Sequence, residues 1–141
     1  CLLGSIVHPS TGTCENCTVG RYAAQGDATC TACALGTIAQ AGSSSCSQCL
    51  AGSVPDWDQG ACVTCPTGRY AVPGNAMCTE CASGSFAPES SAICSQCSGG
   101  WVPDASKGAC QTCPAGRHAA PGDAMCSECA SDTFASEGSE V

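Results

Sequence analysis

The residues best suited to chemistry in this chain are its seventeen cysteines, nearly all of which occur as C-x-x-C pairs. The pairs fall at positions 14/17, 30/33, 46/49, 62/65, 78/81, 94/97, 110/113 and 126/129, and Cys1 has the same phase. Each step is sixteen residues, without one insertion or deletion. Thiols at this spacing can bind zinc as thiolates, work as redox motifs or join as disulfides. The spacing C-x2-C-x12-C-x2-C is close to that of a zinc ribbon, so four zinc sites are one interpretation.

The composition favours disulfides over zinc. The 43% hydrophobic content depends largely on Cys and Ala, and only two Trp, two Tyr and two Phe are present. One bulky apolar side chain in each sixteen-residue repeat cannot offset the cost of ordering the backbone, about 1–2 kcal/mol per residue. A disulfide that closes a loop of about 15 residues contributes roughly 3 kcal/mol. We therefore expect a disulfide scaffold in an oxidising compartment, extracellular or at the cell surface, with zinc as the alternative.

Other residues that could carry chemistry have few partners. His8 and His118 have no acid or nucleophile at a useful spacing, so we expect no catalytic residue, no cofactor and no enzymatic activity. The segment 56–60, Asp-Trp-Asp-Gln-Gly, has two ligands of a calcium loop but lacks the third ligand and the terminal Glu, which favours a solvated turn. Asn16, in Asn-Cys-Thr, is a candidate N-glycosylation site, as in an extracellular glycoprotein.

The charge of the chain restricts its partners. The net charge is −8, and the only cationic side chains are Arg21, Arg69, Arg117 and Lys107. Nucleic acids need a basic surface, so a nucleic-acid partner is disfavoured. No apolar run approaches the length of a membrane span, so we expect no membrane insertion within this segment. The chain starts at Cys1 rather than Met, and we interpret it as a mature piece or a slice of a longer repeat protein.

Sequence identity is stronger at forty-eight residues than at sixteen. Three super-repeats, 1–48, 49–96 and 97–141, therefore form a single tandem-repeat array. Arg21, Arg69 and Arg117 occupy the same place in this longer period. They are either surface charges copied by gene duplication or inter-strand contacts that meet acidic side chains of a neighbouring strand or repeat.

The positions of Gly and Pro in each repeat predict turns and short strands. A Gly follows the opening Cys by three residues in nearly every repeat, and no segment has the 3.6-residue apolar period of a helix. The predicted fold is a small, disulfide-rich, elongated solenoid or rod of tandem sixteen-residue units, with short β-strands and little or no helix. We expect contacts only between adjacent repeats, with about three repeats per turn.

The motif C-P-x-G-x-aromatic followed by C-x-x-C carries a family resemblance. It is clearest at residues 65–70, Cys-Pro-Thr-Gly-Arg-Tyr, and at residues 113–118, Cys-Pro-Ala-Gly-Arg-His. It resembles the ephrin-receptor-like cysteine repeats and the first module of tumour-necrosis-factor-receptor cysteine-rich domains, which occur also in protist surface antigens and flagellar-hair (mastigoneme) proteins.

In those families the Cys before the Gly turn pairs with the next Cys along the chain. The resemblance therefore implies the bonds Cys1–Cys14, Cys17–Cys30, Cys33–Cys46, Cys49–Cys62, Cys65–Cys78, Cys81–Cys94, Cys97–Cys110 and Cys113–Cys126. Cys129 is then left without a partner among these residues.

The constant period also bears on function. Receptor modules vary in loop length, whereas these loops do not vary at all. We therefore expect an extracellular structural protein, a segment of a surface fibre or coat, whose partners are further copies, other fibre or coat proteins, or glycans. A receptor ectodomain or stalk that binds a protein ligand is the alternative.

Overall fold

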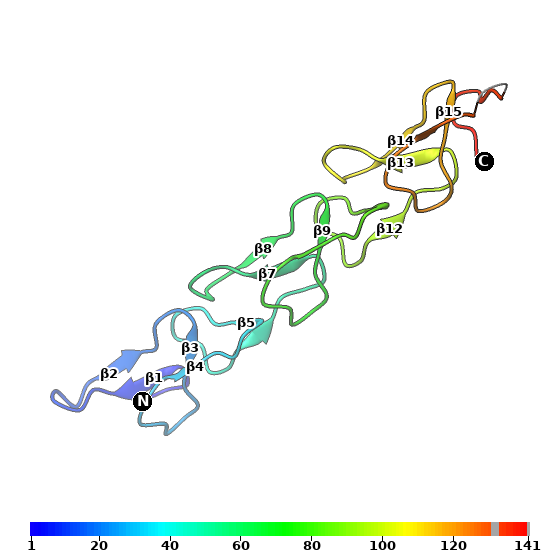
Figure 1. Ribbon diagram of the computed structural model, residues 1–141. Coiled ribbons are helices and arrows are strands. Elements are labelled where there is room, and N and C mark those ends of the chain that lie inside the picture. The colour runs from blue at the N-terminus through cyan, green and yellow to red at the C-terminus, as the bar shows by residue number, and fades with distance from the viewer. Residues whose placement is uncertain (131–132, 141) are drawn as a thin grey trace. The chain divides into compact units, whose positions relative to one another are not determined.

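The computed structural model describes residues 1–130 and 133–140, and within them the regular structure consists of short strands without a helix (Figure 1). The strands, each of two or three residues, are β1 Ser5–Val7, β2 Cys14–Asn16, β3 Arg21–Tyr22, β4 Thr31–Ala32, β5 Thr37–Ile38, β6 Ser47–Gln48, β7 Ser53–Pro55, β8 Cys62–Thr64, β9 Arg69–Tyr70, β10 Thr79–Glu80, β11 Ser85–Phe86, β12 Ser95–Gln96, β13 Trp101–Pro103, β14 Cys110–Thr112, β15 Arg117–His118 and β16 Ser127–Glu128.

Each odd-numbered strand pairs with the strand that follows it, as a two-stranded antiparallel hairpin. The hairpins β1–β2, β7–β8 and β13–β14 have three-residue strands, and the other hairpins have two-residue strands. The longer hairpins therefore recur every forty-eight residues, the period of the super-repeats. In these hairpins one more backbone bond closes the tip, from Asp56 N to Ala61 O at 3.0 Å and from Asp104 N to Ala109 O at 3.0 Å.

The chain divides into two compact parts. The first contains Cys1–Thr64 with Val72–Cys78, and the second contains Cys65–Ala71 with Thr79–Val141.

The core of both parts is made of sulfur and alanine. Five of the alanines at the seventh position of a repeat are at most 3% exposed, as are several cysteines that open a repeat. These buried residues include Ala23, Ala39, Ala71, Ala87 and Ala119, with Cys17, Cys49, Cys65, Cys97 and Cys113. Among the bulkier side chains, Val54 and Val102 are also buried, whereas Phe134 is 93% exposed. Disulfides and small side chains thus take the place of an aliphatic core.

The buried alanines are small because their backbones bond directly to the neighbouring repeats. Gly4 N donates to Ala23 O at 2.8 Å, and Ala23 N donates to Ser43 O at 3.2 Å. The same two hydrogen bonds recur in the second part, where Gly68 N donates to Ala87 O and Ala87 N donates to Lys107 O, both at 2.8 Å. Backbone groups that approach each other at this distance leave little space for a side chain larger than a methyl group.

The contacts extend further than adjacent repeats, so that expectation was wrong. A β-carbon on Gly4 would overlap the carbonyl group of Gly42, in the next repeat but one. A β-carbon on Gly20 would lie 2.5 Å from Asp58 O, again thirty-eight positions later. All these glycines have positive φ, 79° at Gly4 and 73° at Gly20, so the turn and the close approach both need glycine. The backbones of these two repeats are therefore packed against the next repeat and against the one after it.

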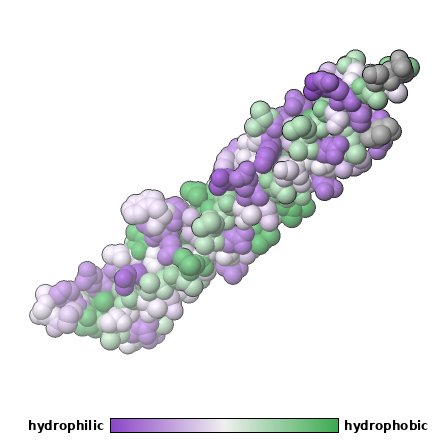
Figure 2. Space-filling view, in the orientation of Figure 1, coloured by the Kyte–Doolittle hydropathy of each residue, from purple (hydrophilic) through white to green (hydrophobic). Residues whose placement is uncertain are grey.

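The predicted fold class is confirmed in its disulfide-rich, tandem, short-stranded character. The elongated shape and the number of repeats per turn stay predictions. No helix of the described residues has the length and apolarity to cross a membrane. Figure 2 shows apolar residues in small patches interrupted by polar ones on the face in view.

Candidate functional sites

The disulfides bring together the cysteines that the resemblance paired. Cys1–Cys14, Cys17–Cys30, Cys33–Cys46, Cys49–Cys62, Cys81–Cys94, Cys97–Cys110 and Cys113–Cys126 each span thirteen residues, with Cα–Cα distances of 5.4–5.8 Å. These distances lie in the ordinary range for disulfides. Cys65 and Cys78 are disulfide-bonded as well. Zinc needs deprotonated, unbonded thiols, and these sulfurs are already bonded to sulfur.

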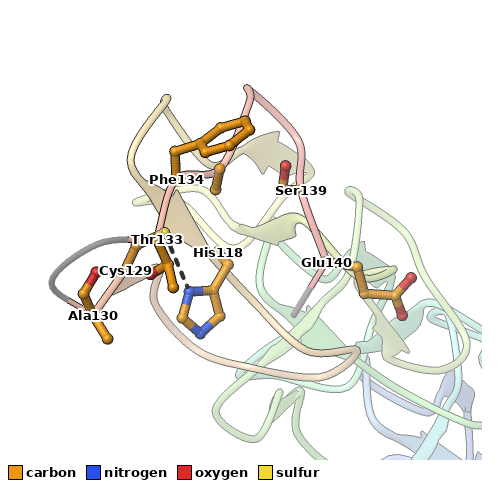
Figure 3. A pocket seen from close by; sticks show the side chains of 8 residues that line it. His118, Cys129, Ala130, Thr133, Phe134, Ser139 and Glu140 are labelled. Atoms are coloured by element: carbon orange, nitrogen blue, oxygen red, sulfur yellow. Dashed lines mark hydrogen bonds between the residues drawn. The ribbon is translucent and has the colours of Figure 1, made fainter.

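Cys129 is a free cysteine, half-buried beside a cavity of about 330 Å³ (Figure 3). Its Sγ lies 3.9 Å from Nδ1 of His118, an arrangement that the sequence spacing did not reveal. The two residues meet because Cys129 directly follows strand β16, which pairs with the strand that carries His118. An activated nucleophile usually lies about 2.6–3.2 Å from its base, and the base is oriented by a third group. The Sγ–Nδ1 distance is longer than this range, and no third group contacts His118 among the described residues.

His8 belongs to a local turn. Its Nδ1 lies 3.0 Å from Ser10 Oγ and accepts from Ser10 N at 3.4 Å. Neither an acid nor a nucleophilic thiol contacts this ring in the described part of the chain.

Asn16, the candidate glycosylation site, lies on strand β2 and is exposed. Its Oδ1 accepts from Ser5 Oγ at 3.1 Å, while its Nδ2 lies 3.5 Å from the place of a β-carbon on Gly42. Gln48 and Gln96 cover Gly74 and Gly122 in the same way. A glycan on Asn16 would be attached at the nitrogen that faces Gly42, so its attachment requires this contact to open.

The two acidic loops are turns whose carboxylates face their own backbone. Asp56 Oδ1 accepts from Gly60 N at 2.9 Å and from Ala61 N at 3.2 Å. In the equivalent loop, Asp104 Oδ1 accepts from Ser106 Oγ at 2.8 Å and from Gly108 N at 3.0 Å. The Ser106 hydroxyl, followed by the Gly108 amide, holds the pKa of Asp104 below its usual value. These contacts agree with the interpretation as solvated turns. No group of three potential metal ligands occurs among the described residues.

The three arginines have different surroundings, although they share one place in the repeat. Arg117 Nη2 donates to Glu128 Oε1 at 2.7 Å, across hairpin β15–β16. Arg21 Nη1 donates to the carbonyl of Cys30 at 3.2 Å, because Ala32 stands opposite Arg21 in the strand register. Arg69 stands opposite Glu80, but that carboxylate is bonded elsewhere.

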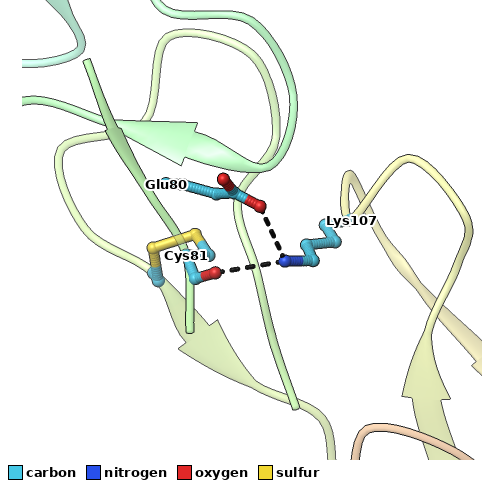
Figure 4. A network of polar contacts seen from close by, with 4 residues as sticks. Glu80, Cys81 and Lys107 are labelled. Carbon is cyan, nitrogen blue, oxygen red and sulfur yellow. Dashed lines mark hydrogen bonds and ion pairs between the residues drawn. A yellow bond between two sulfur atoms is a disulfide. The ribbon is translucent and has the colours of Figure 1, made fainter. Parts of the chain in front are cut away.

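The partner of Glu80 is Lys107, which lies two repeats later in the sequence (Figure 4). Lys107 Nζ donates to Glu80 Oε1 at 3.1 Å and to Cys81 O at 3.3 Å. The Lys107 hydrogen bond, then the charges of Lys107 and Arg69, lower the pKa of Glu80. Sequence reasoning missed this pair, since only the packing of non-adjacent repeats brings residues 80 and 107 together.

Comparison of the sequence with protein-family models gave no match, and comparison with curated protein sequences gave none either. What the disulfides do indicate is an extracellular-type cysteine-rich repeat protein that is stable in an oxidising environment.

Proposed function

We propose that this chain is a structural segment of an extracellular fibre or surface coat. The proposal rests on one observation: successive repeats are joined by equivalent backbone hydrogen bonds. In the first part, Gly4 N and Gly20 N donate to the alanine oxygens nineteen positions later, both at 2.8 Å. In the second part, Gly100 N and Gly116 N do the same, at 2.7 and 2.9 Å. One operation repeated between identical modules is how fibrous and solenoid proteins grow in a single direction.

The distribution of the disulfides supports a structural role. Each disulfide described above joins cysteines thirteen residues apart, so the covalent cross-links are distributed evenly along the sequence. The resemblance to surface antigens and flagellar-hair proteins agrees with this proposal. The described cavities are shallow surface features whose lining differs from place to place, unlike a single substrate pocket.

Shape and location together test the proposal. A compact protein of 141 residues has a radius of gyration of about 14 Å. We expect small-angle scattering from the oxidised chain to give a clearly larger value. Immunogold labelling of intact, unpermeabilised source cells should place an antibody against this chain along filaments or a continuous coat.

Two results would count against a structural segment. A radius of gyration near that of a compact domain would show that the repeats do not extend in one direction, as a fibre segment requires. Sparse labelling at the plasma membrane, together with saturable binding of a soluble protein ligand, would favour the receptor alternative.

A further inference from the structure

Two of the four cationic side chains of this acidic protein line one cavity. Arg69 and Lys107 meet around a space of about 200 Å³ in the second compact part, together with Glu80, Thr67 and Ser106. Their formal charges sum to one positive charge, since Glu80 offsets one of the two cations. The chain as a whole carries −8, so this local excess of positive charge is opposite to its surroundings.

Arg69 lacks the partner that its counterpart has. Arg117 stands opposite Glu128 in the strand register and bonds to it at 2.7 Å. Arg69 stands opposite Glu80 in the same register, but Glu80 Oε1 accepts from Lys107 Nζ instead. The Arg69 guanidinium makes no hydrogen bond or ion pair with any described residue, and the side chain is exposed. Because Lys107 binds Glu80, the N–H donors of the Arg69 guanidinium have no acceptor among the described residues at the edge of the cavity.

The turn that carries Lys107 is held by its own backbone and by Asp104. Lys107 has a φ of 54°, and its N donates to Asp104 O at 3.0 Å. Its O accepts from Ala87 N at 2.8 Å, which joins the turn to the preceding repeat. Asp104 holds the rest of the turn through Ser106 and Gly108. The ammonium group itself is held by its hydrogen bonds to Glu80 and Cys81 before any ligand arrives, which reduces the entropy lost on binding.

The chemistry of the cavity selects its ligand. A guanidinium presents paired N–H donors that match the two oxygens of a carboxylate, and one excess positive charge matches a monoanion. A dianion would also be repelled by Glu80 and by the net negative charge of the chain. No aromatic residue lines the cavity to pack against a sugar ring, which favours an acidic side chain over a sugar acid. We propose that this cavity binds a single carboxylate side chain of a partner polypeptide, with Arg69 as the bidentate donor and Lys107 beside it.

The proposal is independent of the fibre or coat role, and a titration of the intact, oxidised chain tests it. The probes are sodium acetate and N-acetyl-glutamate amide, with sodium chloride at equal ionic strength as the salt control. We expect saturable NMR shifts at the Arg69 Nε–H and at the amides of Thr67 and Gly68. Arg69→Gln should weaken binding about tenfold, the typical effect of losing a charge-assisted pair. Arg117→Gln, a matched control, should leave the titration unchanged.

The repeats themselves suggest two further variants. Lys107→Gln copies Gln59, forty-eight residues earlier, and should release Glu80 to pair with Arg69, so that binding weakens although Arg69 is intact. Glu80→Ala copies Ala32 and should tighten binding several-fold, because both cations then face the ligand. This gain of affinity also tests the site if Arg69→Gln fails to fold.

Three outcomes would overturn the proposal. The first is a shift that grows linearly and equals the effect of chloride. The second is a titration that Arg69→Gln leaves unaltered. The third is glucuronate binding much more tightly than N-acetyl-glutamate amide, which would assign the cavity to an acidic saccharide instead.

Discussion

Gly36 and Gly74 lie so close that a β-carbon on Gly36 would overlap the carbonyl group of Gly74. Gly36 also has a φ of 82°, a conformation that favours glycine. Gly26 has a φ of 92° and nothing within 4 Å of an added β-carbon. The two glycines therefore separate the cost of the backbone conformation from the cost of the packing.

We expect Gly26→Ala to lower the free energy of unfolding by about 1–2 kcal/mol, the cost of a left-handed alanine. Gly36→Ala should lower it by that amount and by roughly 1–3 kcal/mol more, because the repeats must move apart. Urea unfolding of both variants measures the difference. Equal losses in the two variants would mean that these repeats do not pack as described.

The thiol content gives a second prediction. Alkylation of the denatured, unreduced protein should label Cys129 and leave the sixteen disulfide-bonded cysteines unmodified. Non-reducing peptide mapping should recover pairs such as Cys33–Cys46. Extensive labelling, or bound zinc in the intact mass spectrum, would contradict the scaffold.

Removal of one disulfide should have a local effect. Replacing Cys33 and Cys46 together by serine avoids a free thiol and opens one thirteen-residue step. We expect a loss of about 3 kcal/mol in the chain-entropy account, with faster amide exchange in that repeat and the two that follow it. Uniformly faster exchange over the whole chain would contradict the local character of the cross-links.

Acid should weaken the turn that Asp104 holds. Hydrogen bonds, first from the Ser106 hydroxyl, lower the pKa of this carboxyl in the folded protein. A lowered folded pKa stabilises the protein above the unfolded value, near 4, and this contribution is lost as pH falls through the folded pKa. Urea unfolding between pH 7 and pH 3 should therefore show declining stability, with a smaller decline in Asp104→Asn. If stability declines equally in Asp104→Asn, Asp104 does not contribute to the loss of stability in acid.

Lys107 should control the protonation of Glu80. Its hydrogen bond is the largest cause of the lowered pKa of that carboxyl, ahead of the charges of Lys107 and Arg69. In Lys107→Gln we expect the pKa of Glu80 to rise towards its ordinary value, as followed by NMR of the side-chain carboxyl carbon. The remaining attraction of Arg69 keeps the rise incomplete. A pKa of Glu80 that stays where it was would show that Lys107 does not bond to it in solution.

The sequence predicted the features that a local pattern determines. The sixteen-residue cysteine period predicted tandem disulfide-rich units, and Gly and Pro predicted turns between short strands, because both features depend on residues close in sequence. The long-range contacts could not be predicted in this way. Gly36 was recognisable as a turn residue, but its approach to Gly74 depends on how the repeats stack. Ala39 was overlooked as core, because a 3% exposed alanine owes its burial to neighbouring backbones rather than to its own hydrophobicity.

The thirty-eight-residue reach between packed glycines imposes an order on folding during synthesis. At a synthesis rate of about 5–20 residues per second, the chain that must pack against Gly4 appears roughly 2–8 seconds later. The Cys1–Cys14 loop needs only fourteen residues, so its two thiols are available to each other well before Gly42 exists. Cys17 emerges only three residues after Cys14, so the first choice of partner is made among three thiols rather than among all seventeen.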